Sequence, residues 1–157
     1  MNTLRCIGRT LGSLSLRAAF AVLAASVPAR AFFHDAPDIE RGRAVYAESC
    51  AVCHGAKLEG QPDWRSALAD GSYPAPPHDE TGHTWHHGDA MLFDYIRRGG
   101  QAVLDDMGVE YTSGMPGFAG KLSDDDIEAV LDFIKSTWPD PVRAAQEERT
   151  QTEASNP

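Results

Sequence analysis

Apolar side chains recur at helical spacing in three stretches of the chain, and the C-terminal stretch is the most regular. Ser123 is suited to cap a helix, with Asp126 three residues on in the arrangement of a capping box. Lys135 suits the C-terminal end, and the breaker Pro139 follows. The pattern therefore predicts an amphipathic helix, whose apolar positions at i, i+3, i+4 and i+7 are Ile127, Val130, Leu131 and Ile134.

Two more helices are predicted nearer the N-terminus. The first runs from about residue 38 to 51, with Asp35 or Asp38 as its cap, and its inward face includes Gly42 and Tyr46. The second begins near residue 88, and a pair of glycines stops it at residues 99 and 100. The apolar stripe of this second helix consists of Leu92, Tyr95 and Ile96.

The segments between and after these helices have the composition of loops. Residues 61–87 are rich in Pro, Gly, Asp and His, and residues 73–77 are stiffened against helix formation. A loop of this length is unusual in a small domain unless another group organises it. Residues 140–157 are polar and charged, so we expect a flexible C-terminal tail there. Because strand patterns are absent, the predicted fold class is all-α.

The most informative motif is the run from Cys50 to His54, which reads Cys-Ala-Val-Cys-His. Cys-x-x-Cys-His is the signature of covalent attachment of haem c. Positions three and four apart share one face of a helix, so Cys50 and Cys53 can both form thioethers with one porphyrin. His54 then projects its imidazole at the iron. A single motif predicts one haem.

Two other kinds of site contain a Cys-x-x-Cys pair. A structural zinc ion needs two further Cys or His ligands at matched spacing. The remaining cysteine, Cys6, lies near the start of the chain, and no histidine pair follows at zinc-finger spacing. A thioredoxin-like redox pair needs a βαβ context, which the pattern lacks. Haem attachment is therefore the favoured interpretation.

Residues 1–31 have the pattern of a secretory signal peptide. Residues 18–27 form a short apolar core, and the small residues Ala29 and Ala31 occupy the positions that a signal peptidase reads. The core is shorter than the roughly 20 apolar residues of a membrane-spanning helix, so we expect cleavage after Ala31 and no stable membrane insertion. The basic residues of the segment, with no acidic residue among them, include Arg5, Arg9 and Arg17.

Export to the periplasm of a Gram-negative bacterium is consistent with the motif, because haem c is attached outside the cytoplasmic membrane. Cleavage leaves 10 basic and 23 acidic residues, a formal charge of −13. Such an acidic surface argues against nucleic acid and anionic lipid as partners. It favours redox partner proteins with a basic docking surface, although solubility alone also accounts for the charge.

These features together resemble the class I monohaem cytochromes c. The resemblance covers roughly residues 38–138, within a domain that we place at residues 32–139. It implies a cytochrome c fold with three main helices and long loops around one covalently attached haem. It also implies a close crossing of the first and last helices, where Gly42 and Tyr46 would meet Val130 and Phe133. The sixth iron ligand implied by the family is Met115, which lies in the sequence Ser-Gly-Met-Pro-Gly-Phe.

Three other features bear on this ligand. Met107 is the rival methionine, but it lacks the flanking Gly and Pro that make a rigid turn around Met115. Met91 is expected to pack on its helix. The histidine-rich tract could bind copper or zinc, or could supply the sixth ligand itself. We expect instead that Trp85 and a neighbouring histidine donate hydrogen bonds to the haem propionates. The histidines of the tract are His78, His83, His86 and His87.

The function predicted from these residues is one-electron transfer between Fe(II) and Fe(III), and not enzymatic catalysis. An iron with His54 on one face and Met115 on the other has no open position for a substrate. Three alternatives remain open at this point. They are a haem with a labile sixth ligand that reacts with peroxide or small gases, a copper-handling module, and a cytochrome subunit of a larger enzyme.

Overall fold

A computed structural model describes residues 37–155. The predicted signal segment, residues 1–31, lies outside the described residues. The chain divides into two units, residues 1–33 and 34–157, and all described residues belong to the second. The described part consists of helices and loops and contains no strand, only two isolated β-bridges. The all-α fold class is therefore confirmed.

The N-terminal helix has three consecutive parts. α1, Ile39–Val45, continues into a π-helical turn, Tyr46–Cys50, and then into α2, Ala51–His54. Asp38 caps α1, since its carboxylate accepts a hydrogen bond from the Arg41 amide at 3.0 Å. The helix predicted for residues 38–51 thus extends to His54, so the whole attachment motif lies on its C-terminal end.

α5, Asp124–Ser136, is the helix predicted from the most regular apolar pattern. Its capping box is complete, because the Ser123 hydroxyl accepts from the Asp126 amide at 3.1 Å and the Asp126 carboxylate accepts from the Ser123 amide at 3.0 Å. The Asp126 carboxylate also accepts from the Ser123 hydroxyl at 2.7 Å. This bond, then the one from the Ser123 amide and then one from Arg41, holds the pKa of the Asp126 carboxyl below its usual range. The inward face of α5 is fully apolar, with Ile127, Ala129, Val130, Leu131, Phe133 and Ile134 all buried.

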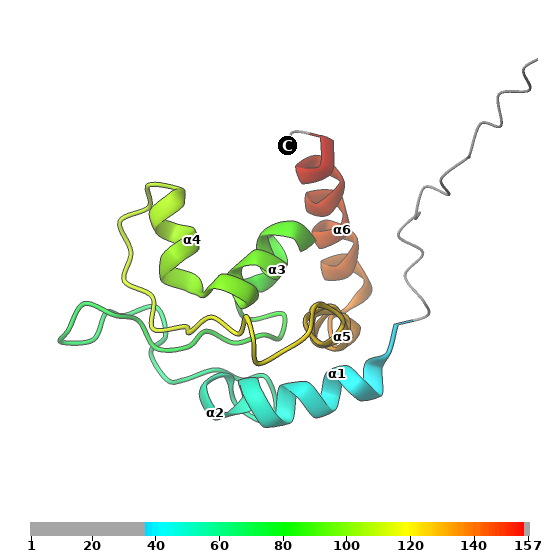
Figure 1. Ribbon diagram of the computed structural model, residues 1–157, viewed down its shortest axis with the longest axis horizontal. Coiled ribbons are helices and arrows are strands. Elements are labelled where there is room, and N and C mark those ends of the chain that lie inside the picture. The colour runs from blue at the N-terminus through cyan, green and yellow to red at the C-terminus, as the bar shows by residue number, and fades with distance from the viewer. Residues whose placement is uncertain (1–36, 156–157) are drawn as a thin grey trace, which may run out of the picture. The chain divides into compact units, whose positions relative to one another are not determined.

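α1 and α5 cross with their backbones in close contact (Figure 1). A Cβ atom at Gly42 would lie 2.0 Å from the Ala129 carbonyl oxygen and 2.8 Å from Cβ of Phe133, so only glycine fits. The Tyr46 ring packs edge-on against Phe133, with 5.5 Å between ring centroids. The expected contact between the first and last helices of the predicted fold is therefore present.

α3, Asp89–Arg98, and α4, Gly100–Asp106, are separated by Gly99. Gly99 has φ +91°, and a Cβ atom there would lie 2.6 Å from the Gly117 amide nitrogen. The second predicted helix is confirmed as α3. α4 was not predicted, because a seven-residue helix with only two buried apolar side chains carries too little periodicity to be recognised.

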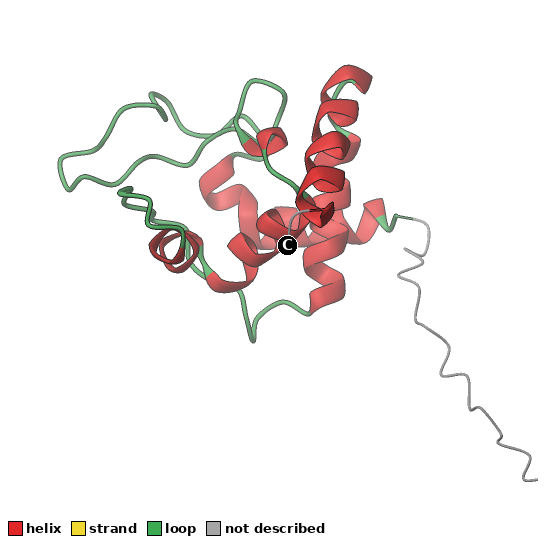
Figure 2. Ribbon diagram, turned by 90° about the horizontal axis from the view of Figure 1, so that it is seen from above, coloured by secondary structure: helices red, strands yellow, loops and turns green. Residues whose placement is uncertain are grey.

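The core lies between the first helix, α3 and α5, and the long loops lie to one side of these helices (Figure 2). It includes one residue of the π-helical turn between α1 and α2, one residue of α3, five residues of α5 and two residues outside the helices. Its buried members are Tyr46, Leu58, Ile96, Ile127, Val130, Leu131, Phe133, Ile134 and Trp138.

The prediction of a flexible tail at residues 140–157 is wrong for most of that segment. Residues Asp140–Ser155 form α6, the longest helix of the described part. Its sequence has no apolar stripe, which is why hydrophobic periodicity gave no signal. It is instead rich in strong helix formers, and Pro141 stands in its first turn, where proline is tolerated.

Polar contacts to α3 hold α6 in place. Gly88 precedes α3 and has no side chain to cap it, so the first amides of α3 need other acceptors. The Glu153 carboxylate accepts from the amides of Ala90 and Met91, both at 3.1 Å. The Thr150 hydroxyl accepts from the Asp89 amide at 3.1 Å. α6 therefore caps the N-terminus of α3 from outside that helix, with a negative charge at the positive end of the helix dipole.

No helix in residues 37–155 is both long enough and apolar enough to cross a membrane. This finding concerns the described part of the chain alone.

We predict that Glu153→Ala destabilises the protein by about 1 kcal/mol, because two amides of α3 lose their acceptor. Glu148→Ala is the matched control, since Glu148 is an exposed glutamate of the same helix. Denaturant unfolding of both variants measures the difference. Equal stability of the two variants would show that the contacts of Glu153 do not hold α6 to α3.

Candidate haem site

The attachment motif lies at the end of the N-terminal helix, with its two thiols at different depths. Cys50 is half-buried, Cys53 is exposed, and both are free cysteines. Val52, between them, is 82% exposed, whereas His54 is only 8% exposed. The motif therefore presents one edge to solvent while its imidazole points into the protein.

The thiols do not have the properties of a redox pair. Burial, with a smaller contribution from Cys53, raises the pKa of the Cys50 thiol to about 11. Redox-active cysteines have a lowered pKa, because the thiolate is the reactive form. Nor do the described residues contain a group of three His, Cys, Asp or Glu side chains that could hold a metal ion. The raised pKa of the Cys50 thiol thus opposes the redox-pair alternative to haem attachment.

The imidazole of His54 is oriented by a backbone carbonyl. Its Nδ1 lies 2.8 Å from the carbonyl oxygen of Pro76. A carbonyl oxygen only accepts hydrogen bonds, so Nδ1 carries the hydrogen and Nε2 keeps a free lone pair. Burial lowers the pKa of His54, although the hydrogen bond to Pro76 opposes this, and the ring is therefore a neutral imidazole. A neutral ring with an oriented Nε2 is the form that binds iron.

Gly60 allows the Pro76 carbonyl to reach this position. A Cβ atom at Gly60 would lie 2.4 Å from the nitrogen of Pro77 and 2.6 Å from the carbonyl carbon of Pro76. The Gly60 amide also donates to the His54 carbonyl at 2.8 Å. One residue further on, the Gln61 amide donates to the Ala75 carbonyl at 2.9 Å and closes the loop between them. The start of the long loop and its middle, at residues 75 and 76, are thus held together beside His54.

His78 lies apart from the other histidines of its tract. Its ring stacks on that of His54, with 3.8 Å between centroids and an interplanar angle of 18°. Burial, followed by the proximity of His54, lowers the pKa of His78 well below its ordinary value. The Nδ1 atom of His78 is buried and has no hydrogen-bond partner. A neutral aromatic side chain therefore fixes one side of the His54 ring.

The segment that carries Met115 is fastened to α3 and α4. The Gly100 amide donates to the Met115 carbonyl at 3.1 Å, and the Met115 amide donates to the Ser113 hydroxyl at 3.3 Å. The Tyr95 hydroxyl donates to Ser113 at 3.2 Å. Met115 is half-buried and packs against the core. Hydrogen bonds of its own carbonyl and amide groups therefore fix the backbone of Met115.

The other methionines are placed differently. Met107 ends α4 and is 55% exposed. Met91 is half-buried on α3, as expected, and its amide donates to Glu153. Exposure thus separates Met115 from Met107, its rival in the sequence.

Trp85 is half-buried and packs against the core, so it stays a predicted neighbour of the haem. Its indole N–H already donates to the Glu80 carbonyl at 3.2 Å. A hydrogen bond to a haem propionate would have to replace that one. The ring of Trp85 also stacks on His86, with 3.7 Å between centroids.

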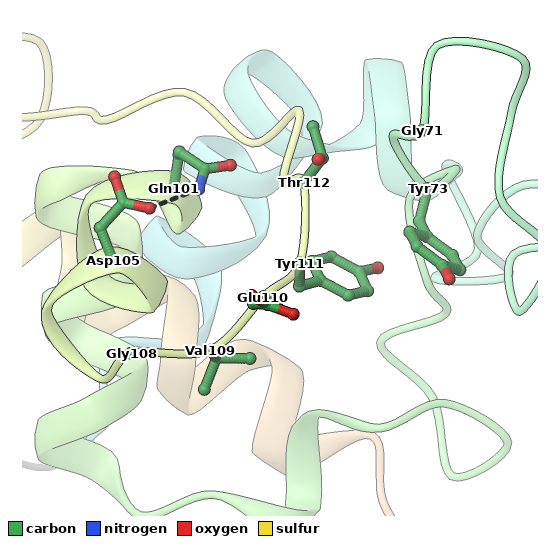
Figure 3. Close-up of a pocket in the computed structure, with 9 residues that line it drawn as sticks. All are labelled: Gly71, Tyr73, Gln101, Asp105, Gly108, Val109, Glu110, Tyr111 and Thr112. Carbon is green, nitrogen blue, oxygen red and sulfur yellow. Dashed lines mark hydrogen bonds between the residues drawn. The ribbon is translucent and has the colours of Figure 1, made fainter.

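The His54 side and the Met115 side of the site are joined by two loops. The rings of Tyr73 and Tyr111 stack with 4.4 Å between centroids, and a β-bridge pairs Ser72 with Thr112. Figure 3 shows the two tyrosines at an open pocket of about 640 Å³, beside α4. None of the residues that line this pocket belongs to the attachment motif, and Met115 does not line it either. The pocket is therefore separate from the predicted axial ligands.

A family model for cytochrome c matches residues 39–138. The chain belongs to the cytochrome c family. Members of this family carry haem c bound covalently through cysteines, and here Cys50 and Cys53 supply the pair. The match begins with the first residue of α1 and ends before α6. No curated protein and no solved structure matched the chain in two further comparisons.

Several residues that shape the site of this cytochrome were missed in the sequence. The Pro76 acceptor is a backbone atom, and any residue type could have supplied it. The prolines of residues 73–77 indicated that the backbone is rigid there, but they did not indicate that the Pro76 carbonyl contacts His54. Trp138 was also missed, because it lies after the apolar pattern that predicted α5. Its indole N–H donates to the His78 carbonyl at 2.7 Å.

We predict that Gly60→Ala displaces the Pro76 carbonyl from the His54 ring of the cytochrome. The added Cβ atom destabilises the protein by about 1–3 kcal/mol through overpacking. A weaker hydrogen bond to Nδ1 makes the imidazole a poorer electron donor, so the reduction potential should rise. Unfolding by denaturant and redox potentiometry measure the two effects.

Gly71→Ala is the matched control. Gly71 has φ +84° and Gly60 has φ +69°, so both variants carry similar backbone strain, but no atom lies within 4 Å of a Cβ at Gly71. Gly71→Ala should leave the potential unchanged. The same shift of potential in both variants would mean that the contact with Pro76 has no influence on the haem.

Proposed function

We propose that this cytochrome is a class I monohaem electron carrier of the periplasm, with His54 and Met115 as the axial ligands of its iron. Haem-based electron transfer is the general function of its family. The observation that supports the proposal most directly is the orientation of His54, whose Nδ1 is held by the Pro76 carbonyl at 2.8 Å.

The protein holds the two proposed axial ligands of the iron in fixed positions. His54 is buried and oriented, and Met115 extends from a segment that hydrogen bonds fix to α3 and α4. Bound haem c supplies the Fe(II)/Fe(III) couple. Ligands that do not move between the two oxidation states reduce the reorganisation that accompanies transfer of an electron. A thioether opposite an imidazole raises the reduction potential relative to two imidazoles.

A six-coordinate haem iron is suited to electron transfer and not to catalysis at the metal. With both axial positions taken by protein side chains, no position is open for a substrate, and we therefore propose that the protein is not an enzyme.

Electrons would enter and leave at the exposed edge of the attachment motif, where Val52 and Cys53 face solvent. The formal charge of −13 on residues 32–157 favours encounter with redox proteins that carry a basic docking surface. Export is proposed from residues 1–31 alone, with cleavage after Ala31 to leave the mature cytochrome.

Substitution of Met115 tests the ligand assignment. The ferric protein should show the weak long-wavelength charge-transfer band of a methionine–iron bond, and Met115→Ala should abolish it. Met107→Ala is the control and should retain the band, because Met107 is exposed at the end of α4.

Two results would contradict the proposal. Persistence of the band in Met115→Ala would show that another residue is the ligand. A high-spin ferric wild-type protein that binds cyanide rapidly would show that the sixth position is open, which favours a reaction with peroxide or small gases.

A further inference from the structure

Electron transfer makes no use of the three surface histidines that follow His78 in the sequence. His83 and His87 flank the 3₁₀ turn Thr84–His86. Their side chains converge, with 2.9 Å between the two Nε2 atoms. We propose that His83 and His87 form a Cu(II) site at the surface of the protein, separate from the haem.

The backbone between the two histidines explains why their rings meet. The His86 amide donates to the His83 carbonyl at 3.1 Å, and the His87 amide donates to the Thr84 carbonyl at 3.2 Å. These two bonds close a tight turn, so that the side chains at its two ends lie on the same side of the chain. The T-shaped contact of the His83 and His87 rings, with 4.7 Å between centroids, follows from this turn.

The turn is fixed at both ends by the rest of the fold. A Cβ atom at Gly82 would lie 1.9 Å from the Pro77 carbonyl oxygen, so the chain enters the turn in close contact with the long loop. At the other end, the buried Gln146 of α6 donates to the His87 carbonyl at 3.2 Å. Two ligands that are already held in place lose little freedom when a metal binds.

The separation of the two nitrogens, which a hydrogen bond sets in the absence of metal, is also compatible with a Cu(II) site. With metal–nitrogen bonds of about 2.0–2.1 Å, two ligands at a right angle lie about 2.9 Å apart, and two tetrahedral ligands about 3.3 Å apart. The observed 2.9 Å matches neighbouring positions of a tetragonal site, the geometry that Cu(II) prefers. Imidazole is a suitable ligand for Cu(II), which also heads the affinity order of the divalent first-row metals.

Without metal, the same distance corresponds to a hydrogen bond from one neutral imidazole to the other. Such a hydrogen bond needs one ring that donates from Nε2 and one whose Nε2 carries no hydrogen. On binding of Cu(II), the ring that donates from Nε2 moves its hydrogen to its own Nδ1. Both Nε2 lone pairs then face the metal, and no proton is released.

The surroundings set the character of the site. Arg65 and Arg149 are close enough to lower the pKa of His83 and His87, respectively, and their positive charges oppose a bound cation. The described residues contain no third His, Cys, Asp or Glu that completes a metal site here. The copper ion would therefore keep water or small-molecule ligands in its remaining positions, and the site would be an open one of moderate affinity.

The test is a titration of the ferric holo-protein with Cu(II) by calorimetry, with EPR to identify the ligands. Ferric haem is used because it has no electron to give to Cu(II). All proteins carry His34→Ala, since cleavage after Ala31 would leave an amino group two residues before His34, a nitrogen set that binds Cu(II) by itself. The expected result is one Cu(II) per protein, with two imidazole nitrogens in the EPR spectrum.

His83→Asn and His87→Asn should each weaken binding by about tenfold or more, because each removes one of two ligands. His86→Asn is the matched control for the loss of a neighbouring imidazole. The His86 ring stacks on Trp85 and also on His83, with 5.2 Å between the His83 and His86 centroids, but the 2.9 Å contact joins the Nε2 atoms of His83 and His87, so this variant should bind as the parent does. Absence of stoichiometric binding by the parent would overturn the proposal. So would equal binding by the parent and the His83 and His87 variants. Circular dichroism confirms that each variant is folded, and the EPR spectrum of the parent tests the ligands without any substitution.

Discussion

The hydrogen bond between the His54 ring and the Pro76 carbonyl is the interaction on which the site depends. It leaves Nε2 of His54 with a free lone pair, and it also joins the end of the N-terminal helix to the long loop. The close approach of Gly60 to the Pro76–Pro77 peptide makes this bond possible. One short polar contact thus links the proposed iron ligand to the path of residues 61–87.

The fold positions this contact through a few close approaches. Gly42 lets α1 and α5 cross, which sets the direction of the helix that carries the motif. Gly99 brings the start of α4 against the segment that carries Met115. α6 caps α3 by polar contacts from Glu153 and Thr150. α1 and α5 thus meet through close backbone contact and an apolar core, whereas α6, which has no apolar stripe, is tied to α3 by capping groups.

The predictions from sequence succeeded where one local pattern determines the outcome. The capping box of α5 and its apolar stripe are such patterns, and so is the cysteine pair Cys50 and Cys53, which agrees with the covalent haem of the family. They failed where stability comes from tertiary contacts. α6 has no apolar stripe, and its stability depends on polar groups of α3 that are distant in the sequence. The Pro76 carbonyl and the stacking of His78 on His54 were invisible for the same reason, since side-chain type does not reveal which backbone or ring will be nearby.

We propose that the iron is closed by His54 on one face and by Met115 on the other. The most direct measurement is the proton NMR spectrum of the ferrous protein with labelled methionine methyl groups. A methyl group on an iron-bound sulfur lies over the porphyrin, whose ring current shifts its signal far upfield. The account predicts one such signal, assigned to Met115. Absence of the signal, or its assignment to Met91 or Met107, would contradict the account.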